Sequence, residues 1–267
     1  SMPEPEDYSV TTGWAVNWQP NGGFQAKLKN GTGEANAWKG TKIPSNMVFV
    51  QGGTFVMGRT QEDVMQDGNN FQKEATVSSF WMDQTEITNL QYREYTDWMR
   101  RVFWEEGEGE FSYLYTHALP DSTVWRSELS YNEPMVSQYF RHPAYQDYPV
   151  VGVSWQQATD YCVWRTDRVN ERILIEACIL KENMEQIDED VFTTQAYLQG
   201  QYEGIVIEAP KNLTNKNYGS GEDTRLVKIE DGLLLPDYRL PTEAEWEFAA
   251  LGYIGNTQEE NTNERKL

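Results

Sequence analysis

The stretch "YRLPTEAEWEFAA", residues 238–250, contains the start of a helix directly after a short extended segment. Pro241 disfavours helical backbone at the residue before it, so the first residues are expected to be extended. Thr242 is placed to act as the N-cap, and Glu245 three residues later completes the spacing of a capping box. The buried face of the predicted helix consists of three side chains: Trp246, Ala249 and Ala250.

Three carboxylates in this stretch raise the question of an acid–base site: Glu243, Glu245 and Glu247. Glu243 and Glu247 are four residues apart on one helix face, whereas Glu245 lies on another face and completes the capping box. Carboxylates in the first turn are also stabilised by the helix macrodipole, by about 0.3 to 1 kcal/mol each. We therefore interpret these acids as structural and not catalytic.

Two earlier helix starts share this chemistry, because Thr88 with Gln91 and Ser154 with Gln157 have the same capping-box spacing. The first predicted helix has apolar residues at helical spacing: Tyr95, Trp98, Met99, Val102 and Phe103. The second has a corresponding face: Trp155, Ala158, Cys162, Val169 and Ile173. Both helices are predicted to be amphipathic.

Two segments before these helices are predicted to be strands. In "MVFVQGGTFVMG", residues 47–58, a Gly-Gly pair joins two apolar runs, which is typical of a two-residue hairpin. Residues 75–87 form the next predicted strand, with Val77, Phe80 and Met82 facing a core. Strands and amphipathic helices together predict an α+β fold.

Composition limits the classes of partner. The 267 residues are 39% hydrophobic, enough for a substantial core. There are 42 acidic and 22 basic residues, a net charge of −20, so a nucleic-acid backbone would be repelled. The longest apolar stretches, such as 173–180, are far shorter than the roughly twenty residues of a membrane-spanning helix.

The chain is predicted to comprise an N-terminal arm, residues 1–46, and one domain, residues 47–267. The arm is rich in Gly, Asn, Pro and Trp and has no sustained period. Two long irregular stretches interrupt the domain, at 104–147 and 184–236. Stretches of this length are usually functional or flexible.

Candidate metal ligands do not form a recognisable site. His117 and His142 match no zinc spacing. Four residues between 62 and 70 offer oxygen ligands without the EF-hand order and are interpreted as a solvated loop: Asp63, Asp67, Asn69 and Asn70. We predict no catalytic, cofactor-binding or metal-binding residue in this chain.

Charges and thiols on the second predicted helix are also interpreted as structural. Its basic residues alternate with acids, which is typical of a solvent-exposed, ion-paired face: Arg165, Arg168 and Arg172 with Asp160, Asp167 and Glu171. If Cys162 and Cys178 both lie on this helix, they are about 24 Å apart along its axis. A disulfide needs Cα atoms within roughly 7 Å, so they would pair only if the helix breaks between them.

Four motifs, in this order, resemble the first part of the formylglycine-generating enzyme (sulfatase-modifying factor) family: "MVFVQGGTFVMG", "VSSFWMDQTEITNLQYREYTDWM", "YPVVGVSWQQATDYCVWR" and "YRLPTEAEWEFAA". The resemblance covers about residues 47–254 and implies an irregular α+β fold of the kind grouped with C-type lectins. In that family, the copper-binding cysteine pair and the calcium-binding loops follow the helix that begins after Thr242. This chain is expected to end before that part and to lack both features. Any calcium site is expected in that second part, and Cys162 and Cys178 do not match the catalytic positions.

Within the family, "TTGWAVN", "ALPDSTVWRSELSYNEP" and "YFRHPAYQDYPVVGV" resemble the gliding-motility lipoproteins of the Bacteroidetes type IX secretion apparatus. That resemblance implies a non-catalytic assembly part on the periplasmic side of the outer membrane, held there by a lipid anchor. Other envelope lipoproteins of the apparatus would be its partners. Two alternatives are a copper oxidase acting on a peptide cysteine and a glycan- or peptidoglycan-binding module.

Overall fold

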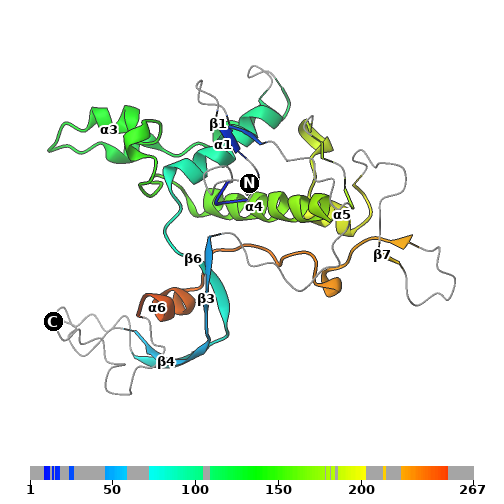
Figure 1. The fold of residues 1–267 in the computed structure, drawn as a ribbon. Coiled ribbons are helices and arrows are strands. Elements are labelled where there is room, and N and C mark those ends of the chain that lie inside the picture. Colours follow the sequence, from blue (N-terminus) through cyan, green and yellow to red (C-terminus); the bar gives the residue numbers. More distant parts are fainter. Residues whose placement is uncertain are drawn as a thin grey trace, which may run out of the picture. The chain divides into compact units, whose positions relative to one another are not determined.

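The computed structural model contains helices and short strands, which confirms the mixed α and β class (Figure 1). It describes these residues: 9–12, 14, 16–18, 24–26, 46–58, 72–104, 109–177, 179–180, 182–183, 186–202, 213–214 and 224–251. Contacts divide the chain into a helical unit, Ser1–Asn46 with Thr85–Arg239, and a ribbon unit, Met47–Gln84 with Leu240–Leu267. No helix within the described ranges is long and apolar enough to cross a membrane.

The ribbon unit is built on two antiparallel strand pairs. These are β3 (Met47–Val50) with β6 (Phe80–Asp83), and β4 (Gly53–Met57) with β5 (Lys73–Val77). Val50 lies opposite Phe80 and Gly53 lies opposite Val77, so the second pair continues the register of the first. The four strands form one antiparallel ribbon that is interrupted in the middle.

The predicted hairpin at the Gly-Gly pair is wrong, because β3 and β4 pair with β6 and β5 and not with each other. Gly52 lies so close to the opposite chain that a Cβ would be 2.4 Å from the Val77 carbonyl oxygen. Its amide donates a hydrogen bond to Ser79 Oγ at 2.9 Å. The glycine therefore allows the chains to approach at the interruption, and the predicted single strand over 75–87 is divided at the same point.

Helix α6 (Glu243–Leu251) begins as the sequence predicts. The Thr242 amide donates to Glu245 Oε2 at 2.8 Å, and the Glu245 amide donates to Thr242 Oγ1 at 3.3 Å. Glu247 Oε1 accepts a hydrogen bond from the Gly58 amide at 3.1 Å. Two of the three acids in the opening motif thus connect the helix to its own cap and to the end of β4.

The predicted buried face of α6 is wrong. Trp246 is 62% exposed, whereas Phe248 is 4% exposed and packs against Phe55 with ring centroids 5.3 Å apart. Ala244 and Leu251 pack in the same cluster, at the helical spacing that places them on the Phe248 face. The apolar face of the ribbon selects this side of the helix, and that choice depends on a partner distant in sequence.

The helical unit contains the remaining elements. These are β1 (Val16–Trp18), β2 (Phe24–Ala26), α1 (Asn89–Phe103), α2 (Ser112–Ala118), η2 (Ser122–Trp125), α3 (Glu133–Gln138), η3 (Pro143–Tyr145), α4 (Trp155–Glu176), η4 (Asp188–Asp190), α5 (Thr194–Leu198), β7 (Leu213–Thr214), β8 (Thr224–Arg225) and η5 (Ile229–Asp231). Both predicted capping boxes are present, at Thr88 and at Ser154. The described parts of the stretches 104–147 and 184–236 contain short helices instead of being wholly irregular.

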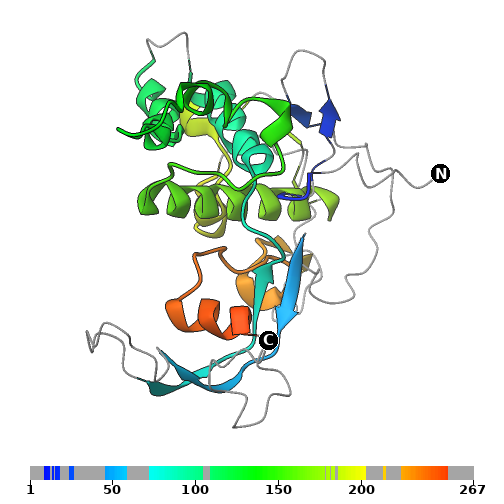
Figure 2. The same ribbon diagram turned by 90° about the vertical axis from the view of Figure 1, so that its left-hand side faces the viewer.

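Helices α1 and α4 lie side by side in both ribbon views and share an aromatic core (Figures 1 and 2). Tyr92 on α1 stacks on Tyr161 of α4 with ring centroids 5.5 Å apart, and Tyr95 contacts Trp164. The predicted face of α1 is confirmed, since its apolar residues are buried or pack against this core. Aromatic pairs of this kind add about 0.5 to 1.5 kcal/mol to the effect of burial.

The predicted face of α4 is confirmed only in its second half. Val169 and Ile173 are buried, whereas Trp155 is 71% exposed. The two ends of the helix face different neighbours: Tyr161 and Trp164 pack against α1, and Val169 and Ile173 pack against Leu235. A helix of 22 residues that changes neighbours along its length has no single apolar stripe.

The α6 face is tested by comparing Phe248→Ala with Trp246→Ala. Loss of the buried phenyl ring should lower the free energy of unfolding by about 3 to 5 kcal/mol, because it leaves a cavity against Phe55. The same truncation at exposed Trp246 should cost less than about 1 kcal/mol. Urea denaturation followed by circular dichroism measures both, and an equal or larger loss for Trp246→Ala contradicts this packing.

Candidate functional site

Helix α4 carries buried charged side chains in its second half. Arg165, Arg168 and Glu171 are only 2%, 5% and 2% exposed. The interpretation of this helix face as solvated is therefore wrong for these three residues. The polar groups are enclosed because residues from the N-terminal segment, from 186–194 and from 235–238 all hydrogen-bond to α4.

Arg168 and Glu171 form a buried ion pair with a nitrogen–oxygen distance of 2.7 Å. Gln186 donates to Glu171 Oε1 and accepts from Arg168 Nη1, and Arg168 Nη2 donates to the Phe192 carbonyl oxygen. The Arg168 guanidinium also lies 4.7 Å from the centroid of the Trp98 ring. Burial raises the pKa of Glu171, and the Arg168 charge opposes that rise. The pair thus connects α4 to α1 and to the segment before α5.

The second buried arginine holds the N-terminal segment. Arg165 Nε donates to the Thr11 carbonyl oxygen at 2.9 Å, and its guanidinium lies 4.5 Å from the centroid of the Tyr238 ring. Trp14 Nε1 donates to the Arg168 carbonyl oxygen at 2.9 Å. Thr11 and Trp14 of the predicted arm therefore contact α4.

Glu94 on α1 completes the attachment of this segment. Its carboxylate accepts from Ser9 Oγ at 2.7 Å and from Thr12 Oγ1 at 3.0 Å. Burial raises the pKa of Glu94, whereas these hydrogen bonds and the Arg165 charge lower it. The net effect is a raised pKa, so desolvation outweighs the hydrogen bonds.

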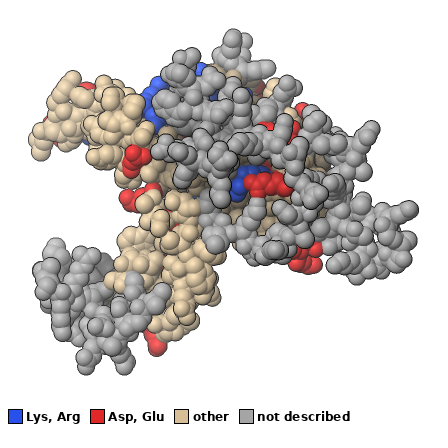
Figure 3. All heavy atoms as spheres, viewed as in Figure 1, with Lys and Arg blue, Asp and Glu red and all other residues tan. Residues whose placement is uncertain are grey.

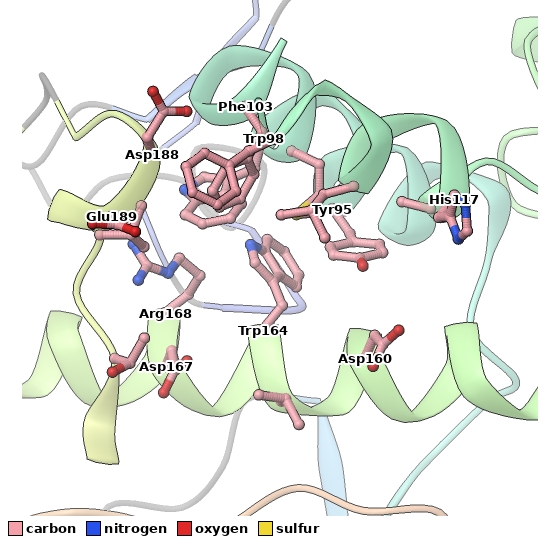
Figure 4. A pocket seen from close by; sticks show the side chains of 17 residues that line it. Tyr95, Trp98, Phe103, His117, Asp160, Trp164, Asp167, Arg168, Asp188 and Glu189 are labelled. Carbon is pink, nitrogen blue, oxygen red and sulfur yellow. The ribbon is translucent and has the colours of Figure 1, made fainter. Parts of the chain in front are cut away.

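A cavity of about 520 Å³ opens between α1, α2, α4 and the 188–193 segment, all within the helical unit (Figure 4). Five aromatic side chains line it: Tyr95, Trp98, Phe103, Phe111 and Trp164. Figure 4 shows Asp188 and Glu189 at one end and Asp160 and His117 at the other. An apolar cavity with a few polar groups at its rim is the usual form of a binding site.

The residues weighed as metal ligands do not come together. His117 lies at the rim of the cavity, whereas His142 Nδ1 accepts from the Ala144 amide and caps η3. The four oxygen ligands of the predicted solvated loop, between 62 and 70, lie outside the described residues. Within the part of the chain that the structure describes, no group of three His, Cys, Asp or Glu side chains could hold a metal ion.

The two cysteines differ in position. Cys162 is half-buried on α4, and the helix ends at Glu176, before Cys178. Cys178 lies outside the described residues. The condition that both thiols share one helix is therefore not met, and the absence of a disulfide between them stays a prediction.

Comparison with known families identifies the domain. The sequence model of the family "Sulfatase-modifying factor enzyme 1-like domain" matches residues 34–265. The chain belongs to this family. The match confirms the family resemblance carried by the four ordered motifs, from the β3 segment to the helix after Thr242.

Relatives of the sulfatase-modifying-factor family include both active and inactive proteins. The chain is 31% identical over 138 residues to the inactive C-alpha-formylglycine-generating enzyme 2 of Bos taurus, covering 46% of this chain and 45% of the relative. It is 25% identical over 141 residues to the formylglycine-generating enzyme of Bos taurus, covering 47% and 37%. The enzyme of Thermomonospora curvata is 26% identical over 140 residues, covering 48% and 46%. The matched region spans less than half the length of each relative.

The α4 ion pair is tested by two matched substitutions on the same helix. In Glu171→Gln, the buried Arg168 guanidinium loses its counter-charge, so the free energy of unfolding should fall by about 3 to 5 kcal/mol. In Glu176→Gln, the more exposed pair with Arg172, also 2.7 Å, is lost, and the cost should be below about 1 kcal/mol. Urea denaturation measures both variants. If Glu171→Gln and Glu176→Gln lower the free energy of unfolding by similar amounts, burial does not distinguish the Arg168 pair from the Arg172 pair.

The raised pKa of Glu94 predicts a pH dependence. Because the folded pKa exceeds the unfolded value of about 4.3, the stability from Glu94 is fully present below that pH. It is lost as the pH rises through the folded pKa. Glu94→Gln does not titrate, so its free energy of unfolding should rise relative to wild type from about pH 4 to pH 7, by about 1.4 kcal/mol per unit of pKa shift.

Urea titrations at several pH values measure this difference, with the exposed Glu128→Gln variant as the control for loss of one negative charge. A constant difference between Glu94→Gln and wild type over this range would exclude the raised pKa.

Proposed function

We propose that this chain is a non-catalytic, protein-binding member of its family and serves as an assembly part of the gliding-motility and type IX secretion apparatus. In this proposal it is a lipid-anchored lipoprotein on the periplasmic side of the outer membrane, similar to GldJ and, next, to GldK. The irregular C-type-lectin-like fold is part of the same proposal. Support comes from the sequence resemblance and from the two matched relatives that are named inactive.

The main support for a binding role is an exposed apolar surface in the 104–147 stretch, which we call the apolar tip. It is defined by Val124, Leu129 and Tyr131. These side chains are 50%, 97% and 82% exposed. Leu129 lies within the turn at Ser127–Ser130, and Val124 and Tyr131 lie on either side of it, before α3. Figure 3 shows that the surface around α3 is mostly uncharged in this view. Exposed apolar side chains that gather in one segment are typical of protein-interaction surfaces.

The tip is held by a folded support. Trp125 and Tyr139 pack with ring centroids 4.6 Å apart, and Asn132 Nδ2 donates to the Trp125 carbonyl oxygen at 3.1 Å. Buried Asn89 at the start of α1 donates to the carbonyl oxygens of Tyr139 and Tyr145. The support fixes the backbone on both sides of the tip before binding, which lowers the conformational entropy that a partner must remove.

Close backbone contact secures the base of this segment. The Asp121 amide donates to the Gly152 carbonyl oxygen at 2.8 Å, and a Cβ on Gly152 would be 2.2 Å from the Asp121 carbonyl oxygen. Gly152 also has a φ of 83°, which favours glycine. The stretch 104–147 is therefore well suited to present a partner-binding surface.

The charged residues of α4 also support a non-catalytic role. Arg165, Arg168 and Glu171 are each bound to protein groups that hold the fold together. A general acid or base needs a protonation state that changes at the site of reaction, and these contacts oppose such a change. The buried ion pair between Arg168 and Glu171 is thus explained by assembly of the fold.

Partner binding is tested with Leu129→Ser/Tyr131→Ser. The double variant should bind the gliding and secretion lipoproteins of cell envelopes at least about tenfold more weakly, which corresponds to about 1.4 kcal/mol of binding free energy. A pull-down from cell envelopes measures this as reduced recovery. Ile229→Ser is the matched control, because Ile229 is 61% exposed in the same unit but outside the tip. Recovery of the same identified lipoproteins by the double variant and the control would reject the tip as the contact.

A second function is favoured by the matched relatives that are named formylglycine-generating enzymes. In that case the protein would oxidise a cysteine of a substrate peptide, with a bound copper ion as cofactor and dioxygen as the oxidant. An assay of the full native protein on a cysteine-containing sulfatase peptide distinguishes the two. Conversion of the cysteine to formylglycine would replace the non-catalytic proposal.

A further inference from the structure

The cavity of the helical unit has an uneven charge distribution. Four carboxylates line it: Asp160, Asp167, Asp188 and Glu189. Besides His117, the only basic side chain among the described lining residues is Arg168, and its charge is already balanced by Glu171 at 2.7 Å. The lining therefore attracts a cation, and the low-dielectric aromatic walls strengthen that attraction relative to open water.

The acids lie at both ends, with the aromatic rings between them (Figure 4). Asp188 and Glu189 belong to η4, within the long stretch 184–236, whereas Asp160 belongs to α4. A ligand with one positive group could meet only one end. A ligand with two positive groups and an apolar group between them would complement both ends and the middle.

A buried donor beside the cavity has no partner among the described residues. Trp164 is only 6% exposed, and its Nε1 has no acceptor among the described residues. Figure 4 shows the indole rising from α4 between Arg168 and Tyr95, with its nitrogen on the Trp98 side. An unpaired buried donor costs about 1 to 3 kcal/mol. Because this nitrogen is closed to a water-sized atom, the indole must turn before a peptide carbonyl can accept its hydrogen bond.

We propose that this cavity binds a peptide segment of a partner protein in which two basic side chains flank an apolar one. The carboxylates at the two ends bind the ammonium or guanidinium groups, and the aromatic middle holds the apolar side chain. This site goes beyond the proposed assembly function, because it uses none of the residues of the apolar tip. Its failure would leave the test with Leu129 and Tyr131 unaffected.

A sugar is the competing ligand, since aromatic rings and carboxylates also bind carbohydrates. The lining favours the peptide because its unbalanced negative charge gives a neutral sugar no advantage. Calorimetric titration of the 267-residue chain with acetyl-Arg-Leu-Arg-amide tests the choice. The matched peptide with citrulline in place of both arginines keeps the shape and removes the charge.

We expect the arginine peptide to bind at least about tenfold more tightly than the citrulline peptide, and to weaken as salt is raised. Equal binding of the two peptides, or binding of chitotriose without binding of the arginine peptide, would overturn the proposal. So would a failure of all three to bind.

Two variants test binding at the end of the cavity that Asp188 and Glu189 form. Asp188→Asn and Glu189→Gln should each weaken the arginine peptide by about threefold to tenfold. Asp188 has a φ of 48°, which Asn adopts readily, so this substitution is compatible with the backbone. Asp190→Asn is the control, because Asp190 is an exposed neighbour that does not line the cavity. An equal effect of Asp190→Asn would show that only the general negative charge matters.

Discussion

The buried ion pair between Arg168 and Glu171 is the interaction on which the helical unit depends. A charge in a low-dielectric interior costs several kcal/mol unless a partner and hydrogen bonds compensate it. Here the compensation comes from Gln186, from the Phe192 carbonyl oxygen and from the ring of Trp98. These groups come from two other parts of the chain, α1 and residues 186–192, so α4 is stably buried only when both are in place.

This dependence explains which features could be predicted from the sequence. The three capping boxes are local, because Thr88, Ser154 and Thr242 each bond to a residue three positions away. The face of a helix that becomes buried is not local. Phe248 is buried because the ribbon presents Phe55 to it, and no spacing within α6 contains that information. The family could be predicted for the same reason as the capping boxes, since the resemblance rests on short contiguous motifs.

The ribbon and the charged helix show the same limit in different ways. A Gly-Gly pair between apolar runs fits a hairpin, but it fits equally well a point where two long paired chains approach closely, as Gly52 and Val77 do. Alternating charges fit a solvated helix, but Arg165 and Arg168 lie within one turn of Trp164 and Val169, which are buried. That proximity on the helix surface was the available signal for burial, and it was outweighed by the usual behaviour of charged residues.

The same pair also determines the electrostatics of the cavity. Had Arg168 faced the cavity without Glu171, its charge would have offset one of the carboxylates there. Because the Arg168 guanidinium is bound to Glu171 and Gln186, it does not compensate the charges of the other lining residues Asp160, Asp188 and Glu189. Glu171, which stabilises the fold by pairing with Arg168, thus also leaves the aromatic cavity with a negative charge. Neither the ion pair nor the charge of the cavity requires that the chain catalyse a reaction.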